Sequence, residues 1–539
     1  MKNHFQPSRR GFIAGAALGA TPIAALPTAL PAQAAGGAAG PGGRVVTPDD
    51  PRYPDLVWGA NQRWIGAPEA VHVAGSTGDV AKIVRAAVRA GRRIAVRSGG
   101  HCYENFVGDP AVRVVLDLSR LDEVTYDPRR RAFAVEAGAT LGDVYRGLYK
   151  DWGVTIPGGS CPTVGVGGHI AGGGFGPLSR SLGLTVDHLA AVEVVVVDAD
   201  GGVRTVLATR AASDPHHDLW WAHTGGGGGN FGVVTRYWFR SPGATGDDAG
   251  SLLPRPPSEV LVSTVAWGWP TVNETSFARL LKNFGTFHER NSSPGSPYAA
   301  MFSQFNLTHK SAGGFAVTTQ IDARTPNAER LLDDYLAAVN EGVGVPTLVL
   351  ERRRLPWLHA ATQWPGFAAT DTTTRFKGKS AYLRKGLSDE QIAAFHKHLT
   401  RADYHNPTAI VMLMSHGGKV NTVAPGATAV AQRDSVIKAN YIGFWTDQAR
   451  DDEHVAWVRD FYRDVYADTG GVPVPGDRTD GCFINYADAD LADPKWNGSQ
   501  VAWHRLYYKD NYPRLQQVKA RWDPRNVFHH ALSIPLPKS

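Results

Sequence analysis

A glycine-rich stretch over residues 158–176 carries the clearest chemical signal in the sequence. It reads G-G-S-C-P-T-V-G-V-G-G-H-I-A-G-G-G-F-G, and nearly half of it is glycine. Without Cβ atoms, successive backbone N–H groups can point inward and form a concave anion-binding nest. The length of this nest suits a pyrophosphate better than a single phosphate. The buried-type residues Val164, Val166, Ile170 and Phe175 argue against the alternative, a flexible glycine linker.

A second candidate for chemistry is His101, at the end of the segment R-S-G-G-H over residues 97–101. A lone histidine is more often a polar surface residue than a functional one. Here two glycines precede it, at a turn that follows an apolar run, so the imidazole can approach a ligand closely. A dinucleotide loop of the Rossmann type fits neither stretch, because no strand–GxGxxG–helix unit with a following acidic residue can be placed.

The elements around His101 follow from the spacing of apolar residues. Residues 71–74 predict a strand, and Ser76 or Thr77 can cap a helix whose apolar positions between 80 and 88 recur at i, i+3, i+4 and i+7. Residues 93–96 predict the next strand. The histidine turn is therefore expected at the end of a strand in a strand–helix–strand unit.

Together the two motifs resemble those of the berberine bridge enzyme-like flavoproteins, which are FAD oxidases of the vanillyl-alcohol-oxidase/p-cresol-methylhydroxylase type. The resemblance implies a two-lobed α+β FAD-binding fold whose substrate lobe is an antiparallel sheet backed by helices. It also implies FAD attached through its 8α-methyl to His101 and through C6 to Cys161. Cys102 departs from the commonest pattern, in which an acidic residue follows the histidine.

The resemblance assigns further residues to the FAD site. From the two motifs we expect the following to contact the cofactor: Arg97, Ser98, Gly99, Gly100, Gly158, Gly159, Ser160, Thr163, Val164, Gly165, Gly167, Gly168, His169, Gly173 and Gly174. From later segments we expect Gly232, Val233, Val234, Asn485, Tyr486 and Asn511. The glycines at 225–229 are expected along the ADP part, although a plain tight loop is an equal alternative.

Composition, motifs and predicted elements divide the chain into four regions. Residues 1–34 form an export signal, 44–245 an FAD-binding lobe, 246–450 an α+β substrate lobe, and 451–539 a segment that returns to the FAD lobe and closes the active site. In the FAD lobe, strands are expected near 112–118 and 132–135, a helix at 140–150, and a hairpin over 192–207. In the substrate lobe, strands are expected at 259–267, 300–307 and 315–321, with helices at 327–338 and 388–399.

The catalytic candidates come from the resemblance as well. Tyr486, in the segment N-Y-x-D-x-D-L, is expected to face the flavin and to act as the base. An unperturbed tyrosine has a pKa of about 10, so a nearby cation or the hydrogen-bonding edge of the flavin must lower the pKa of Tyr486, and Lys377 or Lys379 could supply the charge. His416 stands where a second family tyrosine is usual and is a possible replacement, and Tyr441 is a further candidate base.

The first residues predict export. Ser8-Arg9-Arg10-Gly11-Phe12-Ile13 is a twin-arginine motif, followed by an apolar run and the Ala32-Gln33-Ala34 cleavage pattern. The run contains Gly and Pro and is too weak for a stable membrane anchor. We therefore expect the twin-arginine export machinery as a partner and secretion as the outcome, which suits a protein that folds around its cofactor first.

Composition is that of an ordinary globular enzyme, with 43% hydrophobic and 20% charged residues and a net charge of +6. The two arginine triplets, 129–131 and 352–354, look like surface clusters, so no nucleic acid partner is expected. No metal site is expected. Of the three cysteines, Cys102 and Cys482 are expected to be free buried thiols, although their pairing stays open.

These observations predict an exported oxidase that takes hydride from a hydroxyl-bearing small molecule and passes the electrons to O2. A secondary metabolite is the expected substrate. One alternative is an oligosaccharide oxidised at a hemiacetal hydroxyl, and another is a flavin-carrying binding protein without turnover. Val164, three residues after Cys161, occupies the family position that gates oxygen, and valine there goes with oxidase activity.

Overall fold

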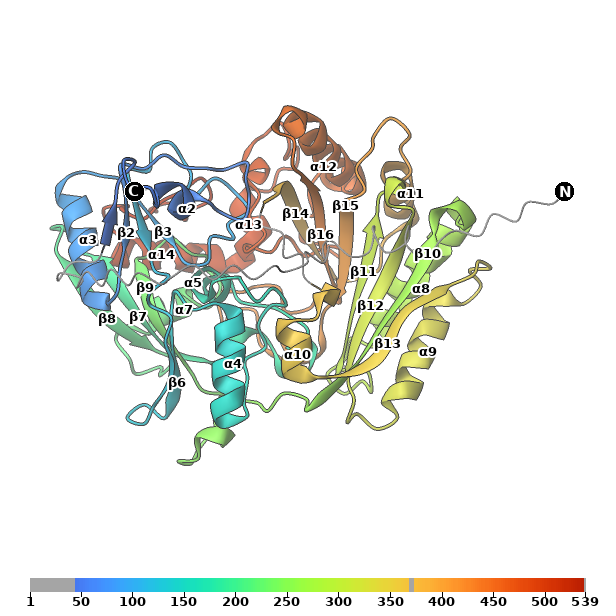
Figure 1. The fold of residues 1–539 in the computed structure, drawn as a ribbon, viewed down its shortest axis with the longest axis horizontal. Coiled ribbons are helices and arrows are strands. Elements are labelled where there is room, and N and C mark those ends of the chain that lie inside the picture. The colour runs from blue at the N-terminus through green and yellow to red at the C-terminus, as the bar shows by residue number, and fades with distance from the viewer. Residues whose placement is uncertain (1–43, 368–372, 538–539) are drawn as a thin grey trace, which may run out of the picture.

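Three β-sheets form the framework of the computed structural model, which describes residues 44–367 and 373–537 (Figure 1). Two smaller sheets lie in the first lobe, and one large sheet lies in the second (Figure 1). The export signal predicted for residues 1–34 lies outside the described residues. The architecture is the α+β fold that the sequence predicts.

The first lobe contains a four-stranded and a five-stranded sheet. The four-stranded sheet has the order β1-β2-β4-β3, in which β2, β4 and β3 run parallel. The five-stranded sheet is antiparallel, with the order β5-β6-β9-β7-β8. The strands are β1 Arg44–Val46, β2 Ala70–Val73, β3 Ile94–Arg97, β4 Val114–Asp117, β5 Val124–Asp127, β6 Ala132–Glu136, β7 Leu189–Val197, β8 Val203–Thr209 and β9 Val233–Phe239.

The second lobe is built on an antiparallel seven-stranded sheet of order β13-β10-β12-β11-β15-β16-β14. Helices α8, α9, α11 and α12 pack together over one face of this sheet, which leaves the other face toward the first lobe (Figure 1). The strands are β10 Glu259–Gly268, β11 Met301–Thr308, β12 Gly314–Asp322, β13 Leu348–Pro356, β14 Arg375–Leu383, β15 Ala409–Ser415 and β16 Ile437–Trp445.

The helices begin where the sequence offers capping residues. Ser76 caps α3 and Ser388 caps α11, while Thr140 and Asp143 form a capping box at the start of α4. The helices are α2 Tyr53–Val57, α3 Thr77–Arg89, α4 Leu141–Trp152, α5 Val166–Ala171, α6 Ser179–Leu182, α7 His217–Ala222, α8 Glu274–Arg290, α9 Ala328–Asn340, α10 Trp357–Thr362, α11 Asp389–Leu399, α12 Asp451–Val465, α13 Trp503–Tyr508 and α14 Tyr512–Trp522.

The C-terminal region differs from the prediction in where its return begins. Helix α12 packs on β14 and β16 of the large sheet, so it belongs to the second lobe although it starts at residue 451. Only after it does the chain cross back, and α14 packs on α7 of the first lobe (Figure 1). The apolar face of α12, which includes Trp457 and Phe461, is buried under the sheet and explains this placement. Within the described residues, no helix has both the length and the hydropathy to cross a membrane.

Candidate functional site

A cavity of about 1320 Å³ is lined by both lobes and by the returning C-terminal segment. Its first-lobe wall includes the histidine turn, the glycine-rich stretch and the loop at 227–234. Most residues predicted to hold the cofactor line it: Arg97, Ser98, Gly99, Gly100, His101, Gly159, Ser160, Cys161, Val164, Gly165, Gly167, Gly168, His169, Gly232, Val233, Val234, Asn485 and Tyr486. The structure thus brings residues from four distant parts of the sequence to one cavity.

The two motifs meet backbone against backbone at Gly99 and Gly165. A Cβ on Gly165 would lie only 2.1 Å from the Gly99 nitrogen, and a Cβ on Gly99 would lie 2.3 Å from the Gly165 nitrogen. Contacts this short exclude any side chain at either position. The glycines therefore allow the close approach that places His101 beside Cys161.

His101 and Cys161 are connected through one hydroxyl group. Thr163 Oγ1 lies 3.1 Å from His101 Nε2 and 3.4 Å from Cys161 Sγ. Burial, aided by the charge of Arg97, lowers the pKa of His101 to about 4, so its imidazole is neutral at physiological pH. A neutral imidazole and a thiol on one wall are the donor set that covalent attachment to two flavin positions requires.

Tyr486 borders the same cavity and stacks on Tyr103. The ring centroids are 5.0 Å apart and the interplanar angle is 17°. Gly378 of β14 lies against the edge of the Tyr103 ring, since a Cβ there would come within 2.8 Å of two ring carbons. Asn440 Nδ2 donates to the Tyr103 hydroxyl at 3.4 Å. Burial, together with the nearby Cys161 thiol, raises the pKa of Tyr486 to about 12.

A lysine that sequence reasoning did not single out, Lys438, places its amino group over the ring of Tyr486. Its Nζ lies 4.8 Å from the Tyr486 ring centroid, 4.2 Å from that of Phe483 and 3.9 Å from that of Phe175. Within the described part of the chain, this Nζ has no hydrogen-bond partner. Burial lowers the pKa of Lys438 well below its usual value, because the site offers ring faces but no carboxylate.

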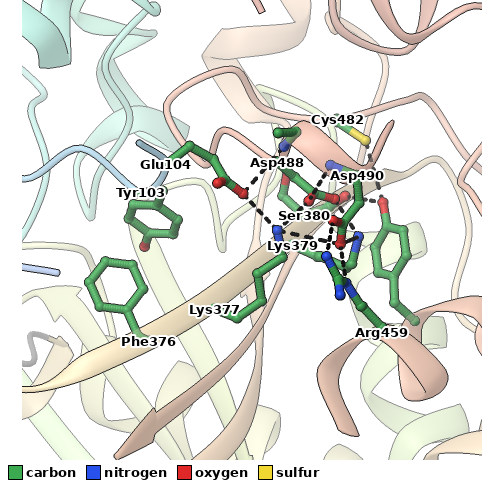
Figure 2. Close-up of polar contacts among 12 residues, drawn as sticks. Tyr103, Glu104, Phe376, Lys377, Lys379, Ser380, Arg459, Cys482, Asp488 and Asp490 are labelled. Carbon is green, nitrogen blue, oxygen red and sulfur yellow. Dashed lines mark hydrogen bonds and ion pairs between the residues drawn. The ribbon is translucent and has the colours of Figure 1, made fainter. Parts of the chain in front are cut away.

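The lysines expected to assist Tyr486 lie elsewhere. Lys377 and Lys379 point away from the cavity into a buried group of acidic side chains, where Lys377 Nζ contacts Glu104 at 2.6 Å and Asp488 at 2.7 Å (Figure 2). The prediction was wrong because residues at odd positions of β14 share one face of the strand, and that face is covered by α12.

Tyr441 does not lie with the other predicted site residues. Its ring packs against Phe395 of α11 and Phe461 of α12, and its hydroxyl contacts that of Tyr466 at 3.0 Å. Neighbouring Asn440 and Ile442 line the cavity instead, since side chains alternate along β16. Tyr441 is therefore on the helix-covered face of the sheet and is not placed to act as the base.

His416 lies just behind the cavity wall. Its ring stacks on Phe175 at 5.1 Å, and Phe175 separates it from the cavity. Burial, followed by the charge of Lys438, lowers its pKa to about 3, so the ring is neutral. This placement makes His416 a packing partner of Phe175, not a second group that touches substrate.

Five predicted cofactor residues stand outside the cavity lining. The Asn511 amide donates to the Pro425, Thr428 and Ala429 carbonyls and braces that loop. The other four, which support the lining from behind, are Gly158, Thr163, Gly173 and Gly174. Their backbones pack on Tyr145, Val430 and Thr185, and Thr163 reaches His101 and Cys161 as described above.

The second-lobe wall of the cavity is the open face of the large sheet, and it is divided by polarity. Apolar Met412, Met414 and Ile442 line the cavity from β15 and β16. Beyond them lies a strip of neutral polar side chains on β10, β11 and β12, which we name the polar strip: Thr264, Gln304, Asn306 and Thr318. Cross-strand pairing links Met414 to Gln304, Gln304 to Thr318, and Thr318 to Thr264, so the strip runs across the strands.

Members of the polar strip contact one another. Gln304 Nε2 donates to Asn306 Oδ1 at 2.8 Å, and Asn306 Nδ2 donates to Thr318 Oγ1 at 3.4 Å. Thr318 and Thr264 hydroxyls are 3.4 Å apart. Strands are spaced about 4.8 Å apart, so the strip begins roughly 10 Å from β16. It offers amides and hydroxyls, the groups that bind sugar hydroxyls.

The residues present fit FAD. The glycine cradle around Gly99 and Gly165 excludes side chains, and a neutral imidazole and a thiol face the same space. At the far end, His530 stacks on Phe106 at 3.9 Å and lies beside the Gly228 carbonyl.

Throughout 44–367 and 373–537, His, Cys, Asp and Glu side chains form no group of three or more that could hold a metal ion. Cys102, Cys161 and Cys482 form no disulfide.

Sequence reasoning missed Tyr103, Lys438 and Asn440. Tyr103 lies two residues after His101, and the period-2 alternation of the strand places Lys438 and Asn440 on one face of β16. The alternation was visible in the sequence, but it did not show which face meets the cavity.

Comparison with known proteins agrees with the geometry. Residues 68–207 match the family model of an FAD binding domain, and 482–535 match the model described as berberine and berberine like. The chain is 54% identical to an aclacinomycin-N/aclacinomycin-A oxidase of Streptomyces galilaeus, over 98% of both chains. It is 33% identical to a hexose oxidase of Chondrus crispus, over 91% of this chain and 94% of the other. A glycopeptide hexose oxidase solved with teicoplanin superposes with a TM-score of 0.88 at 53% identity, covering 92% of this chain and 99% of that one.

Proposed function

Since the chain belongs to the berberine bridge enzyme-like family and is an FAD-dependent oxidase, we propose that it oxidises a hydroxyl group of a large secondary metabolite, with FAD held covalently by His101 and Cys161. The observation that carries the proposal is the arrangement of three groups around one cavity. His101 and Cys161 meet through Thr163, and the hydroxyl-bearing ring of Tyr486 borders the same space.

The redox step belongs to FAD, which accepts a hydride when it is bound. The task of this chain is to orient the substrate and to accept the proton of its hydroxyl group. Tyr486 is the proposed acceptor because it is the cavity-lining tyrosine of the segment that the family resemblance marks. Tyr103 holds its ring in place by stacking, and Asn440 holds the Tyr103 hydroxyl.

Attachment at Cys161 would also help Tyr486 to act. Burial is the main cause of the raised pKa of Tyr486, and the Cys161 thiol is the second. A thioether sulfur cannot ionise, so bonding of Cys161 removes the second cause. Lys438, if protonated, would favour the phenolate further across its 4.8 Å contact with the ring.

The oxygen-reactive half of the cycle involves Val164, which lines the cavity three residues after Cys161. We propose that its small side chain leaves a path for O2 to the reduced cofactor and that hydrogen peroxide is the product. One extra methylene in a packed wall can close a path of that size.

The substrate class follows from the division of the second-lobe wall. An apolar ring system suits Met412, Met414 and Ile442, and a hydroxylated unit beyond it suits the polar strip, which begins roughly 10 Å from β16. The four side chains of the polar strip carry no charge, which suits a neutral unit at the strip itself. A glycosylated metabolite meets both requirements. An oligosaccharide is the second candidate, which the polar strip and the likeness to hexose oxidases favour.

We also propose export by the twin-arginine pathway, on the motif at residues 8–13 and the cleavage pattern at 32–34. Replacement of Arg9 and Arg10 by lysine should retain the protein inside cells of a host with that pathway, while the parent appears in the medium. Equal secretion of both would contradict this proposal.

The function is tested by mixing the oxidised holoenzyme with panels of glycosylated metabolites and oligosaccharides, without oxygen. Loss of the oxidised-flavin absorbance identifies the substrate class directly. The proposal expects faster reduction by glycosides with an apolar aglycone than by plain oligosaccharides. Absence of reduction by every hydroxylated compound would instead support a flavin-carrying binding protein.

A further inference from the structure

A buried group of six charged side chains lies beside the Tyr103–Tyr486 stack, and of its members only Glu104 reaches the lining of the cavity. We name it the ion cluster; it consists of Glu104, Lys377, Lys379, Arg459, Asp488 and Asp490 (Figure 2). Five of the six are buried, and Arg459 is partly exposed. With three acids and three bases, the ion cluster is neutral as a whole, so its purpose is not to place a net charge near the active site.

Lys377 connects Glu104 to the rest of the ion cluster. Its Nζ contacts Glu104 Oε1 at 2.6 Å and Asp488 Oδ1 at 2.7 Å. Glu104 Oε1 also accepts the backbone N–H of Ala489 at 3.3 Å. The other two bases do not contact Glu104: Lys379 binds Asp488 and Asp490, and Arg459 binds Asp490.

The residues that Lys377 joins flank the two stacked tyrosines. Glu104 follows Tyr103 directly and is three residues after His101, while Asp488 is two residues after Tyr486. Gly378, next to Lys377 on β14, lies against the Tyr103 ring from the strand side. One ammonium group therefore ties the histidine turn, the tyrosine segment and an edge strand together (Figure 2).

Stability alone explains such a group poorly. A buried ion pair costs desolvation that its attraction often fails to exceed, and apolar replacements of similar volume are often as stable. What charged hydrogen bonds add is direction, because each fixes the angle and distance of its partner. Burial acts to lower the pKa of Lys377, but the carboxylates of Asp488 and Glu104 raise it overall, so Lys377 stays charged.

We propose that the Glu104–Lys377–Asp488 link is a positioning device, which holds the ring of Tyr103 in register with the ring of Tyr486 and so sets the place of the Tyr486 hydroxyl over the substrate. The catalytic consequence rests on the proposed function, whereas the positioning itself does not. Neither Glu104 nor Lys377 is assigned to proton transfer; both act through the two tyrosines.

The test uses the double variant Glu104→Gln/Lys377→Met in the full-length holoenzyme. It removes one acid and one base, so Lys379 and Arg459 still balance Asp488 and Asp490, and no buried charge is left alone. Its matched control is Arg375→Met, which removes an ion pair with Asp451 at 2.5 Å on the same strand and touches neither Glu104 nor Asp488. The single variant Lys377→Arg, which keeps a charge that can reach both carboxylates, serves as the conservative rescue.

Flavin content and the limiting rate of flavin reduction are measured for each protein. Misplacement of a reacting group by about 1 Å can cost up to 10²-fold in rate, so the double variant should lose about 10- to 100-fold in limiting rate while the half-saturating substrate concentration changes little. Arg375→Met should retain the parent rate, and Lys377→Arg should recover most of it. A double variant with the parent rate per bound flavin would overturn the proposal.

A second readout separates this proposal from the proposed function. Hydrogen–deuterium exchange is followed in peptides that cover residues 100–105 and 484–492. The double variant should exchange faster in both peptides together, whereas Arg375→Met should leave both unchanged. If no hydroxylated compound reduces the flavin of the parent enzyme, the proposed function fails. The exchange measurement still shows whether the Glu104–Lys377–Asp488 link positions the two tyrosines. Unchanged exchange in both peptides of the double variant would contradict the link.

Discussion

The rings of Tyr103 and Tyr486 stack with their centroids 5.0 Å apart and their planes 17° from parallel. One belongs to the turn that carries His101, and the other to the segment that returns from the second lobe. The stack therefore brings the proposed cofactor anchor and the proposed base into one rigid arrangement. Aromatic pairs of this kind contribute about 0.5–1.5 kcal/mol beyond their buried area, and here they also fix orientation.

Tyr486→Phe removes only the hydroxyl group, so packing on Tyr103 should survive. We expect the limiting rate of flavin reduction to fall about 10²- to 10⁴-fold, since that is the usual contribution of a general base. Stopped-flow absorbance at saturating substrate measures it. Tyr441→Phe is the matched control, because that hydroxyl lies on the helix-covered face of the sheet. A rate within a few-fold of the parent in Tyr486→Phe would move the role to another group.

Lys438→Met should stabilise the fold. The folded-state pKa of Lys438 is lowered by burial, so between that value and about 10.4 the unfolded chain binds a proton that the folded chain does not. The free energy of unfolding of the parent therefore rises with pH through this window. Buried Lys438 destabilises the fold most at the acidic end of the window.

Urea unfolding at several pH values checks this expectation. The variant should be more stable by about 1–3 kcal/mol near neutral pH, the usual cost of an unsatisfied buried donor, and the difference should narrow toward pH 10. A less stable variant at every pH would show that the three ring faces outweigh the desolvation of the amine.

Val164→Leu should slow reoxidation of the reduced enzyme by oxygen and leave reduction by substrate intact. The physical reason is the added methylene in the cavity wall. Reduced protein is mixed with oxygenated buffer in the stopped-flow instrument, and the parent should reoxidise rapidly. Equal reoxidation rates in parent and variant would make Val164 an ordinary packing residue.

Thr318→Val should raise the half-saturating concentration of a glycosylated substrate several-fold with little change in limiting rate, because it removes one hydroxyl of the polar strip and touches none of His101, Cys161 and Tyr486. Thr319→Val is the control on the next residue of β12, which is buried and does not line the cavity. Equal effects of the two variants would place the sugar-binding surface elsewhere.

Much of the fold could be predicted because its signals are local. The capping residue expected near 76 and the apolar spacing of the helices expected at 140–150 and 388–399 are such signals, and the structure has a cap at Ser76 and helices in both ranges. The placement of α12 could not be predicted in this way. Its apolar face shows that it packs, but only the tertiary structure shows that it packs on the large sheet.

The site residues also differ in whether a local sequence signal marks them. His101 and Cys161 are flanked by glycines whose close approach leaves a mark in the sequence. Lys377, Lys438 and Tyr441 carry no such mark, since a strand exposes two faces and the sequence does not say which one meets the cavity. That is why Lys377 was expected beside Tyr486, where the structure places Lys438 instead.

The central claim is that one cavity holds FAD through both His101 and Cys161, and peptide mass analysis of the purified protein tests it most directly. After acid precipitation and proteolysis, the account predicts flavin mass on the peptide with His101 and on the peptide with Cys161, joined through one cofactor. His101→Ala and Cys161→Ala should each leave a single attachment, and the double variant none. Release of free FAD into the supernatant from the intact protein, with both peptides unmodified, would contradict the account.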